Sequence, residues 1–340
     1  MYTPILKGKA GEFEALRHVS PDVRSAIRPI IELVPDDEGH INLDQMLRVI
    51  NRSIPSGLLI SLDFTYVRDG SASLLSGVAE HLCLAGIPLR PLVRSDDSSE
   101  ALGAARDASR LHGRGACLRM GTLEEDPSTD EVEERLSDVL AGLGLEAEQV
   151  DLLIDFREVL SQRDVDRVAP AARKLLKWSE NRPWRSVTLA AGGFPESIAG
   201  LDRDAVTAVP RYDAMLWKSV TQSVNSLPVW FGDYGIANPA PVKRVPHPSM
   251  PNLRYTAGLN WMVYRQASPR EAGNERFYEL CTALVGSSHW MGPQYSWGDE
   301  RLDRCASRSI TPGNASKWRA YGTSHHLAVV TDRLASLGEP

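Results

Sequence analysis

Short continuous runs of apolar residues alternate with longer segments of helical periodicity along most of this chain. Continuous runs, rather than alternating apolar and polar positions, are typical of parallel strands that are buried on both faces. Eight such runs occur, with segments between them that are long enough to form crossover helices. Together they predict an α/β fold, a (β/α)8 barrel of the TIM type. The runs occupy residues 2–6, 29–34, 58–64, 89–93, 116–120, 152–156, 187–191 and 229–231, and the clearest helical segments occupy 71–85, 98–111, 129–145 and 164–179.

The pattern changes after residue 237, where prolines cluster at 238–241 and again at 246–251. Such a concentration of proline is typical of a boundary between structural units. We therefore expect residues 1–237 to form the barrel and residues 238–340 to form a C-terminal extension.

The extension carries signals for three elements and is rich in aromatic residues. The residues around Gly258-Leu259-Asn260 predict a hairpin at 253–264, and helical periodicity predicts helices at 274–285 and 324–337. Ser324 is the expected N-cap of the second helix. The aromatic side chains are expected to pack in a core, with a stacking surface for a nucleic-acid base or a partner as the alternative. They are Tyr255, Tyr264, Trp290, Tyr295, Trp297 and Trp318.

A charged residue follows seven of the eight apolar runs. The carboxyl ends of all barrel strands meet at one mouth, where barrel enzymes place their chemistry, so we expect these side chains to converge. Buried ions are costly unless they pair or meet a ligand. The charged residues at the strand ends are Lys7, Glu32, Asp63, Arg94, Arg119, Asp155 and Asp233.

Two kinds of chemistry are compatible with this mouth. The carboxylates Asp63, Asp155 and Asp233 can hold a divalent cation, Mg or Mn, or act with Glu32 as general acid and base. The cationic side chains can bind phosphate or carboxylate, and the Gly-Gly pair of the seventh loop lets backbone amides approach an anion. These expected substrate contacts are Lys7, Arg94, Arg119, Arg157, Gly192 and Gly193. The alternative is a ring of salt bridges that supports the barrel and binds nothing, with the Gly-Gly pair as a tight turn.

Composition narrows the choice of partners and compartment. The 340 residues include 38 Lys and Arg against 44 Asp and Glu, a net charge of −6, which disfavours broad coating of nucleic acid. We find no signal peptide, no apolar stretch that could span a membrane, and no zinc, P-loop, Rossmann or serine-hydrolase motif. His325-His326 is expected to be a solvated helix start. Four scattered cysteines indicate reduced thiols and a cytoplasmic protein, and they are Cys83, Cys117, Cys281 and Cys305.

Several stretches of this sequence resemble the family known as Beta protein, which occurs in bacteria and phages. The resemblance covers nearly the whole chain and includes Tyr2–Lys9, Gly193-Phe194-Pro195, Phe231–Gly235, Ser296–Asp299 and Gly322–His326. Tyr234, beside Asp233 in one of these stretches, is a further candidate substrate contact. The family implies no established reaction, but its phage and mobile-element context suggests a role in phage–host conflict.

Four functions remain open from the sequence. The leading hypothesis is an enzyme that hydrolyses a phosphate-bearing substrate, such as a nucleotide or phosphodiester, with Asp155 or Glu32 transferring a proton. The second is a non-catalytic module that binds a small anionic ligand at the barrel mouth and a protein partner through the extension. A nucleic-acid-processing enzyme and a retaining glycoside hydrolase are the third and fourth, the latter because two carboxylates on barrel strands can perform that reaction.

Overall fold

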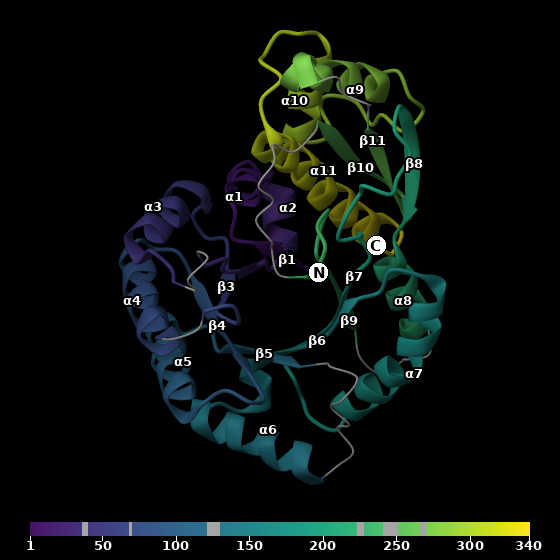
Figure 1. Cartoon of the computed structure of the whole chain (residues 1–340). Coiled ribbons are helices and arrows are strands. Elements are labelled where there is room, and N and C mark those ends of the chain that lie inside the picture. Colours follow the sequence, from purple (N-terminus) through teal and green to yellow (C-terminus); the bar gives the residue numbers. More distant parts are fainter. Residues whose placement is uncertain (36–39, 68–69, 121–129, 223–227, 241–250, 266–269) are drawn as a thin grey trace.

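The larger part of the molecule is a closed barrel of eight parallel strands surrounded by helices (Figure 1). The structure is a computed structural model that describes residues 1–35, 40–67, 70–120, 130–222, 228–240, 251–265 and 270–340. All eight predicted runs are barrel strands, which confirms the (β/α)8 barrel. In order around the barrel they are β1 (Tyr2–Lys7), β2 (Ile30–Glu32), β3 (Ile60–Asp63), β4 (Leu89–Arg94), β5 (Ala116–Met120), β6 (Val150–Glu158), β7 (Ser186–Gly192) and β9 (Val229–Asp233).

Helices follow the strands and cover the outside of the barrel (Figure 1). Local capping explains several of their starts: the side chains of Asn42, Ser98 and Ser161 each accept a hydrogen bond from a backbone N–H in the first turn. The four predicted crossover helices correspond to α4 through α7, although Thr129 lies outside the described residues. The barrel helices are α1 (Ala10–Arg17), α2 (Pro21–Ala26), α3 (Leu43–Ser53), α4 (Ser71–Leu84), α5 (Ser99–His112), α6 (Asp130–Leu143), the short 3-10 turn η1 (Ala147–Gln149), α7 (Gln162–Ser179) and α8 (Tyr212–Thr221).

The C-terminal extension forms an α+β unit at one side of the barrel (Figure 1). The predicted hairpin is present as β10 (Asn252–Ala257) and β11 (Asn260–Arg265), and β8 (Ala205–Pro210) pairs with β11 as the third strand. The sequence did not predict β8, which lies between β7 and α8 of the barrel. Against this sheet and one another pack η2 (Arg270–Glu275), α9 (Arg276–Val285), α10 (Trp297–Ala306) and α11 (Ala315–Ser336).

Aromatic side chains fill the core of this unit, as expected. Tyr255, Tyr264 and Trp318 are buried in it together with apolar residues of α9 and α10. Trp290 and Trp297 pack against its edge, and Tyr295 packs against the main barrel core. These rings therefore contribute to folding of the extension.

Helix α11 joins the extension to the barrel. It packs on β1, α1 and α2, and Lys218 of α8 pairs with Glu339 just beyond the helix, with 2.6 Å between Nζ and Oε2. It therefore completes the helical layer where the helix after the eighth strand belongs (Figure 1). The prediction that this helix begins at Ser324 is wrong, because Asn314 caps it by accepting bonds from the N–H groups of Ser316 and Lys317 at 3.1 and 3.2 Å.

The position of α11 connects the two parts into which the sequence analysis divides the chain, the barrel and the extension. Segments on both sides of residue 237 share one sheet, through β8 and β11, and one helical layer, through α8 and α11. The division into 1–237 and 238–340 stays a prediction from sequence. No described helix has the length and apolar composition needed to cross a membrane.

Candidate active site at the barrel mouth

The side chains inside the barrel lie in layers because alternate residues of each strand point inward. An apolar layer contains Ile5, Ile30, Leu92, Cys117 and Leu153 on five different strands. The next inward position lies two residues further along each strand, towards its carboxyl end. These positions hold Lys7, Glu32, Arg94, Arg119 and Asp155, so strand alternation assembles a charged layer directly above an apolar one.

Arg119 lies at the centre of this layer. Its guanidinium donates to Asp63 and, at 3.0 Å through Nε, to Asp155. A further ion pair joins Arg119 Nη1 to Glu32 Oε1 at 3.0 Å. The buried arginine is therefore neutralised by carboxylates from three different strands. Burial alone would lower its pKa, but Tyr234 and these carboxylates raise it.

Lys7 lies at the edge of the charged layer. Its ammonium pairs with Glu32 and donates to the backbone carbonyl of Pro239 at 2.9 Å. The rings of Tyr66 and Tyr234 lie 5.2 and 5.7 Å from Nζ, within the range of a cation–π contact. Burial lowers the pKa of Lys7, while the charge of Glu32 acts in the opposite direction. The segment that begins the extension therefore forms one wall of the barrel mouth.

Asp155, Arg157 and Tyr234 form a second edge of the layer. The Tyr234 hydroxyl donates to Asp155 Oδ2 at 2.6 Å, and the backbone N–H of Arg157 donates to Asp155 Oδ1 at 2.9 Å. Arg157 has a φ of 56°, which is uncommon for a residue with a side chain. Its guanidinium bonds the hydroxyl of Tyr66 and lies 3.8 Å from Glu32. We call these residues the mouth network, which consists of Lys7, Glu32, Asp63, Arg94, Arg119, Asp155, Arg157 and Tyr234.

The charges of the mouth network fix the protonation of its acids. Burial would raise the pKa of Asp63, but Arg119 and Arg94 lower it to about 2. The pKa of Asp155 is also lowered, because Arg119 and the Tyr234 hydroxyl outweigh its burial. Both carboxyl groups are therefore ionised near neutral pH, and neither is suited to deliver a proton there.

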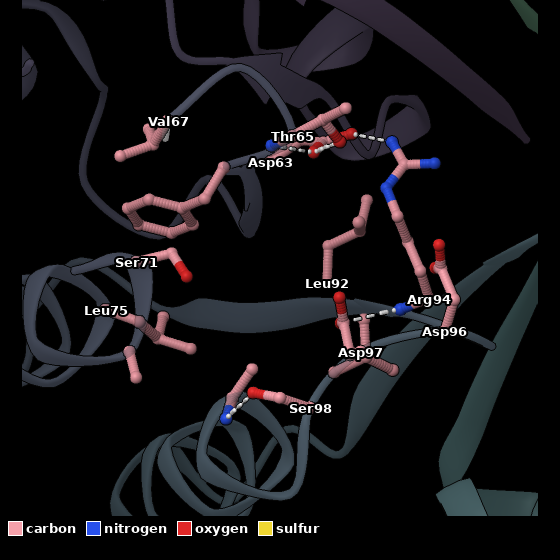
Figure 2. A pocket seen from close by; sticks show the side chains of 14 residues that line it. Asp63, Thr65, Val67, Ser71, Leu75, Leu92, Arg94, Asp96, Asp97 and Ser98 are labelled. Carbon is pink, nitrogen blue, oxygen red and sulfur yellow. Dashed lines mark hydrogen bonds and ion pairs between the residues drawn. The ribbon is translucent and has the colours of Figure 1, made fainter. Parts of the chain in front are cut away.

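A cavity of about 350 Å³ opens beside Arg94, between the ends of β3 and β4 and the first turns of α4 and α5 (Figure 2). Arg94 Nη2 donates to Asp63 Oδ2 at 2.8 Å, and the backbone N–H of Arg94 donates to Asp97 Oδ2 at the same distance. The remaining walls are mixed, with Asp96 and Ser98 on one side and Leu75 and Val67 on the other. The cavity thus offers polar groups of both charges and an apolar wall.

Asp233 does not belong to the mouth network, which corrects the expectation that it shares a site with Asp63 and Asp155. It lies two residues after Phe231, whose side chain packs in the core outside the strands, so the Asp233 side chain also points outward. There it accepts from the Tyr2 hydroxyl at 2.6 Å and from Arg211 at 3.2 Å.

The expected metal site therefore lacks its third ligand. In the part of the chain that the structure describes, no three His, Cys, Asp or Glu side chains are placed to hold a metal ion. The carboxylates of Asp63 and Asp155 both bond the guanidinium of Arg119, which occupies the position between them. These residues do not fit the expected Mg or Mn ion, and we derive no chemistry through one.

The glycines of the seventh loop serve close packing. A Cβ atom on Gly192 would lie 2.2 Å from the Pro239 ring, and one on Gly193 would lie 2.7 Å from Asp213 Oδ1. Both residues are buried beneath these neighbours. The backbone here is covered by the chain itself, in contrast to the phosphate-binding loop that the sequence suggested.

A second buried polar cluster, absent from the sequence predictions, links the barrel to α11. His326 Nε2 lies 2.9 Å from Asp233 Oδ2, and its Nδ1 lies 2.7 Å from the hydroxyl of Thr256. His325 similarly bridges Asp299 and the carbonyl of Thr256, at 2.9 and 2.8 Å. Both histidines are fully buried, so the prediction of a solvated helix start is wrong. The sequence pattern did not show that these histidines lie about three turns inside α11 rather than at its start.

Solved structures similar to this chain are known, but no curated protein sequence matches it. Triosephosphate isomerase from Bartonella henselae is 15% identical over 70% of this chain and 94% of that chain, with a TM-score of 0.34. Type I 3-dehydroquinate dehydratase from Clostridium difficile is 12% identical over 69% of this chain and 85% of that chain, with a TM-score of 0.38. A 3-hexulose-6-phosphate synthase is 15% identical over 70% of this chain and 94% of that chain, with a TM-score of 0.34.

None of these similarities bears on function, because identity and superposition are both low. The fold rests on the strand order of the barrel itself. A relationship in sequence is much more specific. The family model described as Beta protein matches residues 2–332, and the chain therefore belongs to the Beta protein family.

Proposed function

We propose that the barrel mouth binds a small anionic ligand, with Arg94 and Arg157 as its first cationic contacts. This proposal rests on one observation, the difference in solvent exposure between the arginines and the carboxylates of the mouth network. The side chains of Arg94 and Arg157 are 25% and 32% exposed. The carboxylates of Glu32, Asp63 and Asp155 are at most 2% exposed. Within the mouth network, the charged side chains that reach solvent are therefore the cationic ones. The carboxylates of Asp96 and Asp97 lie outside this network, on the cavity wall beside Arg94.

The balance of charges supports the same proposal. The mouth network contains four cationic side chains, Lys7, Arg94, Arg119 and Arg157, against three carboxylates, Glu32, Asp63 and Asp155. These seven side chains carry one excess positive charge, counted without Asp96 and Asp97 on the cavity wall beside Arg94. One anionic group would neutralise the network, and guanidinium groups bind phosphate and carboxylate through paired N–H donors.

The backbone of Arg157 is the second supporting observation. Holding a residue with a side chain in the left-handed region costs on the order of 1 kcal/mol or more, and such strain is found preferentially at functional sites. Here the strained backbone brings the Arg157 N–H to Asp155 while its guanidinium reaches Tyr66 across the mouth. The strain thus positions one cation over the opening.

The adjoining cavity narrows the class of ligand. With an anionic group at Arg94, the rest of the ligand would meet the carboxylates of Asp96 and Asp97 and the apolar wall of Leu75 (Figure 2). Hydroxyl or amino groups suit such carboxylates as hydrogen-bond donors. A nucleotide or a sugar phosphate combines these features, and the cavity of about 350 Å³ is of the size that small-molecule sites have.

Binding is better supported than hydrolysis. A carboxyl group that acts as general acid has to hold a proton near neutral pH, whereas arginines lower the pKa of both Asp63 and Asp155. We therefore favour a binding or sensor module, and the family resemblance makes phage–host conflict its proposed context. The proposal includes a protein partner that binds the extension and responds to whether the ligand is bound at the mouth.

The test is a thermal-shift and calorimetric titration with inorganic phosphate, nucleoside monophosphates and sugar phosphates. We expect at least one to raise the melting temperature, because a ligand that binds the native state stabilises it. Arg157→Gln should weaken its binding about 10-fold or more, since a charge-assisted hydrogen bond contributes roughly 1.5–3 kcal/mol. Arg110→Gln, an exposed site on α5, is the matched control. Unchanged affinity in Arg157→Gln, or no stabilising ligand, would overturn the proposal.

A further inference from the structure

A second hollow lies at the opposite end of the barrel from the mouth. Its volume is about 520 Å³, and its walls come from α2 and from the loops that lead into β3, β4 and β5. Three arginines line it, Arg24, Arg28 and Arg114, together with the serines Ser25 and Ser56. We call this cavity the arginine hollow.

The charge of the arginine hollow is uncompensated. No carboxylate is among its lining residues, and among the described residues no Asp or Glu forms an ion pair with any of the three arginines. The chain as a whole carries a net charge of −6, so a purely cationic cavity departs strongly from its average surface. The N-terminal face of a barrel usually serves stability, and unpaired like charges do not contribute to it.

Arg28 is held in place by the backbone of its own segment. Its Nη1 donates to the carbonyl oxygens of Ser25 and Ile27 at 3.2 and 2.7 Å, and its backbone N–H donates to Tyr2 O at 2.8 Å. A guanidinium carries five N–H donors, so most of the capacity of Arg28 is left over for an anion.

Arg114 is positioned by a rigid loop. Gly113 and Gly115 on either side have positive φ angles of 61° and 66°, and a Cβ atom on Gly115 would lie 1.9 Å from Gln149 O. The Arg114 carbonyl accepts from Arg90 Nε at 3.0 Å and from Arg185 Nη1 at 2.9 Å. The backbone is fixed on three sides while the Arg114 side chain stays exposed.

Other cations crowd the same end of the barrel. Burial lowers the pKa of Arg90 to about 9, with additional repulsion from Arg185, Arg28 and Arg114. Asp151 pairs with Arg90 and Arg185, which leaves the cations of the arginine hollow unbalanced. Burial and the charge of Arg28 also lower the pKa of the α-amino group of Met1. A bound anion would relieve this repulsion.

We propose that the arginine hollow is a second ligand site, which binds a small molecule carrying two or more phosphate groups. Three separate guanidinium groups suit a ligand with several anionic groups better than a ligand with a single one. The two serine hydroxyls can donate hydrogen bonds to the same anionic oxygens. The volume accommodates an oligophosphate with an attached group of nucleoside size. This site lies on different elements from the mouth and does not depend on the function proposed for it.

The experiment titrates the full chain with tripolyphosphate by calorimetry. The double variant Arg24→Gln/Arg114→Gln removes two exposed or half-exposed side chains that make no described ion pair, so folding should be retained and checked by circular dichroism. We expect the dissociation constant of this site to rise at least 10-fold, and wild-type affinity to fall with added salt. The control double variant Arg167→Gln/Arg304→Gln makes the same change in net charge and should bind as wild type does.

Each other outcome decides against the proposal. If both double variants lose the same affinity for tripolyphosphate, the effect is one of net charge. If Arg24→Gln/Arg114→Gln binds tripolyphosphate as tightly as the wild type, the arginine hollow is not its binding site. Tighter binding of a single-stranded oligonucleotide than of tripolyphosphate would make the partner a nucleic acid. Arg157→Gln separates the two sites, because it should weaken binding at the mouth and leave binding at the arginine hollow unchanged.

Discussion

Arg119 illustrates how single residues decide the character of the mouth. It is fully enclosed, and three carboxylates and a phenol surround its guanidinium. Loss of one partner would leave a buried charge without compensation, which is why such pairs are costly to break. The same pairs keep Asp63 and Asp155 ionised, so they favour recognition of anions over proton transfer.

Asp63 should make stability depend on pH. Its pKa falls from an ordinary value of 3.8 to about 2, so the ion pairs stabilise the native state above about pH 4, and this contribution is lost as the pH falls towards 2. The shift corresponds to about 2 kcal/mol. Asp63→Asn should therefore lower the free energy of unfolding by about that amount at pH 7, with the difference shrinking towards pH 2. Urea denaturation across this range measures it.

The exposed Asp138 supplies the control for this pH profile. Asp138→Asn should leave the profile of the wild type unchanged within error, because surface substitutions away from special features have effects within about 0.5 kcal/mol. If Asp63→Asn loses the same stability at pH 2 as at pH 7, the Asp63 carboxylate does not contribute through its charge.

The sequence predicted only some of the charged residues that lie together at the barrel mouth. The rule that a charge follows each apolar run identified Lys7, Glu32 and Arg119 correctly as neighbours at the mouth. It failed for Asp233 because a run without alternating polarity does not tell which residue of a buried strand points inward. The rule also says nothing about Tyr66, whose hydroxyl accepts a hydrogen bond from Arg157 at the mouth.

At the scale of elements, close packing of α11 depends on small residues. Gly322 faces the start of the extension, where a Cβ atom would lie 2.7 Å from Arg254 O and 2.8 Å from Ile236 Cδ1. Gly298 at the start of α10 is even tighter, because a Cβ atom there would lie 2.1 Å from Tyr321 O. The crossing of α10, α11 and β10 leaves no room for side chains at these points.

Gly322→Ala should destabilise the protein despite the higher helix propensity of alanine. The backbone carbonyl of Arg254 would have to move, and overpacking of this kind costs about 1–3 kcal/mol. Gly103→Ala in α5 is the opposite case, since no atom lies within 4 Å of its Cβ position, and should stabilise by about 0.5–1 kcal/mol. Chemical denaturation of both variants checks the sign. A stabilised Gly322→Ala would contradict the packing described here.

Elements with strong local signals were predictable, and those fixed by tertiary contact were not. The eight barrel strands have continuous apolar runs, whereas β8 alternates between half-buried and exposed residues and acquires its role only by pairing with β11. Likewise, α11 begins at Ala315 because Asn314 caps it, although its residues 320–330 are buried all round and show little amphipathic pattern.

At the scale of the whole molecule, buried contacts join the barrel and the extension. His326 of α11 reaches Asp233 of β9, β8 joins the sheet of β11, and Leu327 lies in the main barrel core. These contacts bury both histidine rings and the polar groups that bind them. Separation of the two parts would expose this buried polar and apolar surface together.

Leu327→Ala should therefore lower stability without uncoupling the two parts. Truncation of a fully buried leucine costs about 2–5 kcal/mol. We expect tryptophan fluorescence and far-ultraviolet circular dichroism to report the same denaturation midpoint in this variant. Leu337→Ala, at an exposed position beyond the same helix, should change stability little. Two separate transitions in the wild type or in Leu327→Ala would show that the barrel folds independently.

The position of α11 also sets an order of events during synthesis. The groove on the barrel between α8 and α1 is filled by a helix that spans Ala315–Ser336, while the strands beneath it are complete by Asp233. On the ribosome, the face of β1 that packs against α11 therefore waits for about a hundred further residues, by the difference between these positions. A nascent chain in this interval leaves exposed the apolar side chains of β1 and α1 that α11 later covers, and such transiently exposed surface is prone to aggregation.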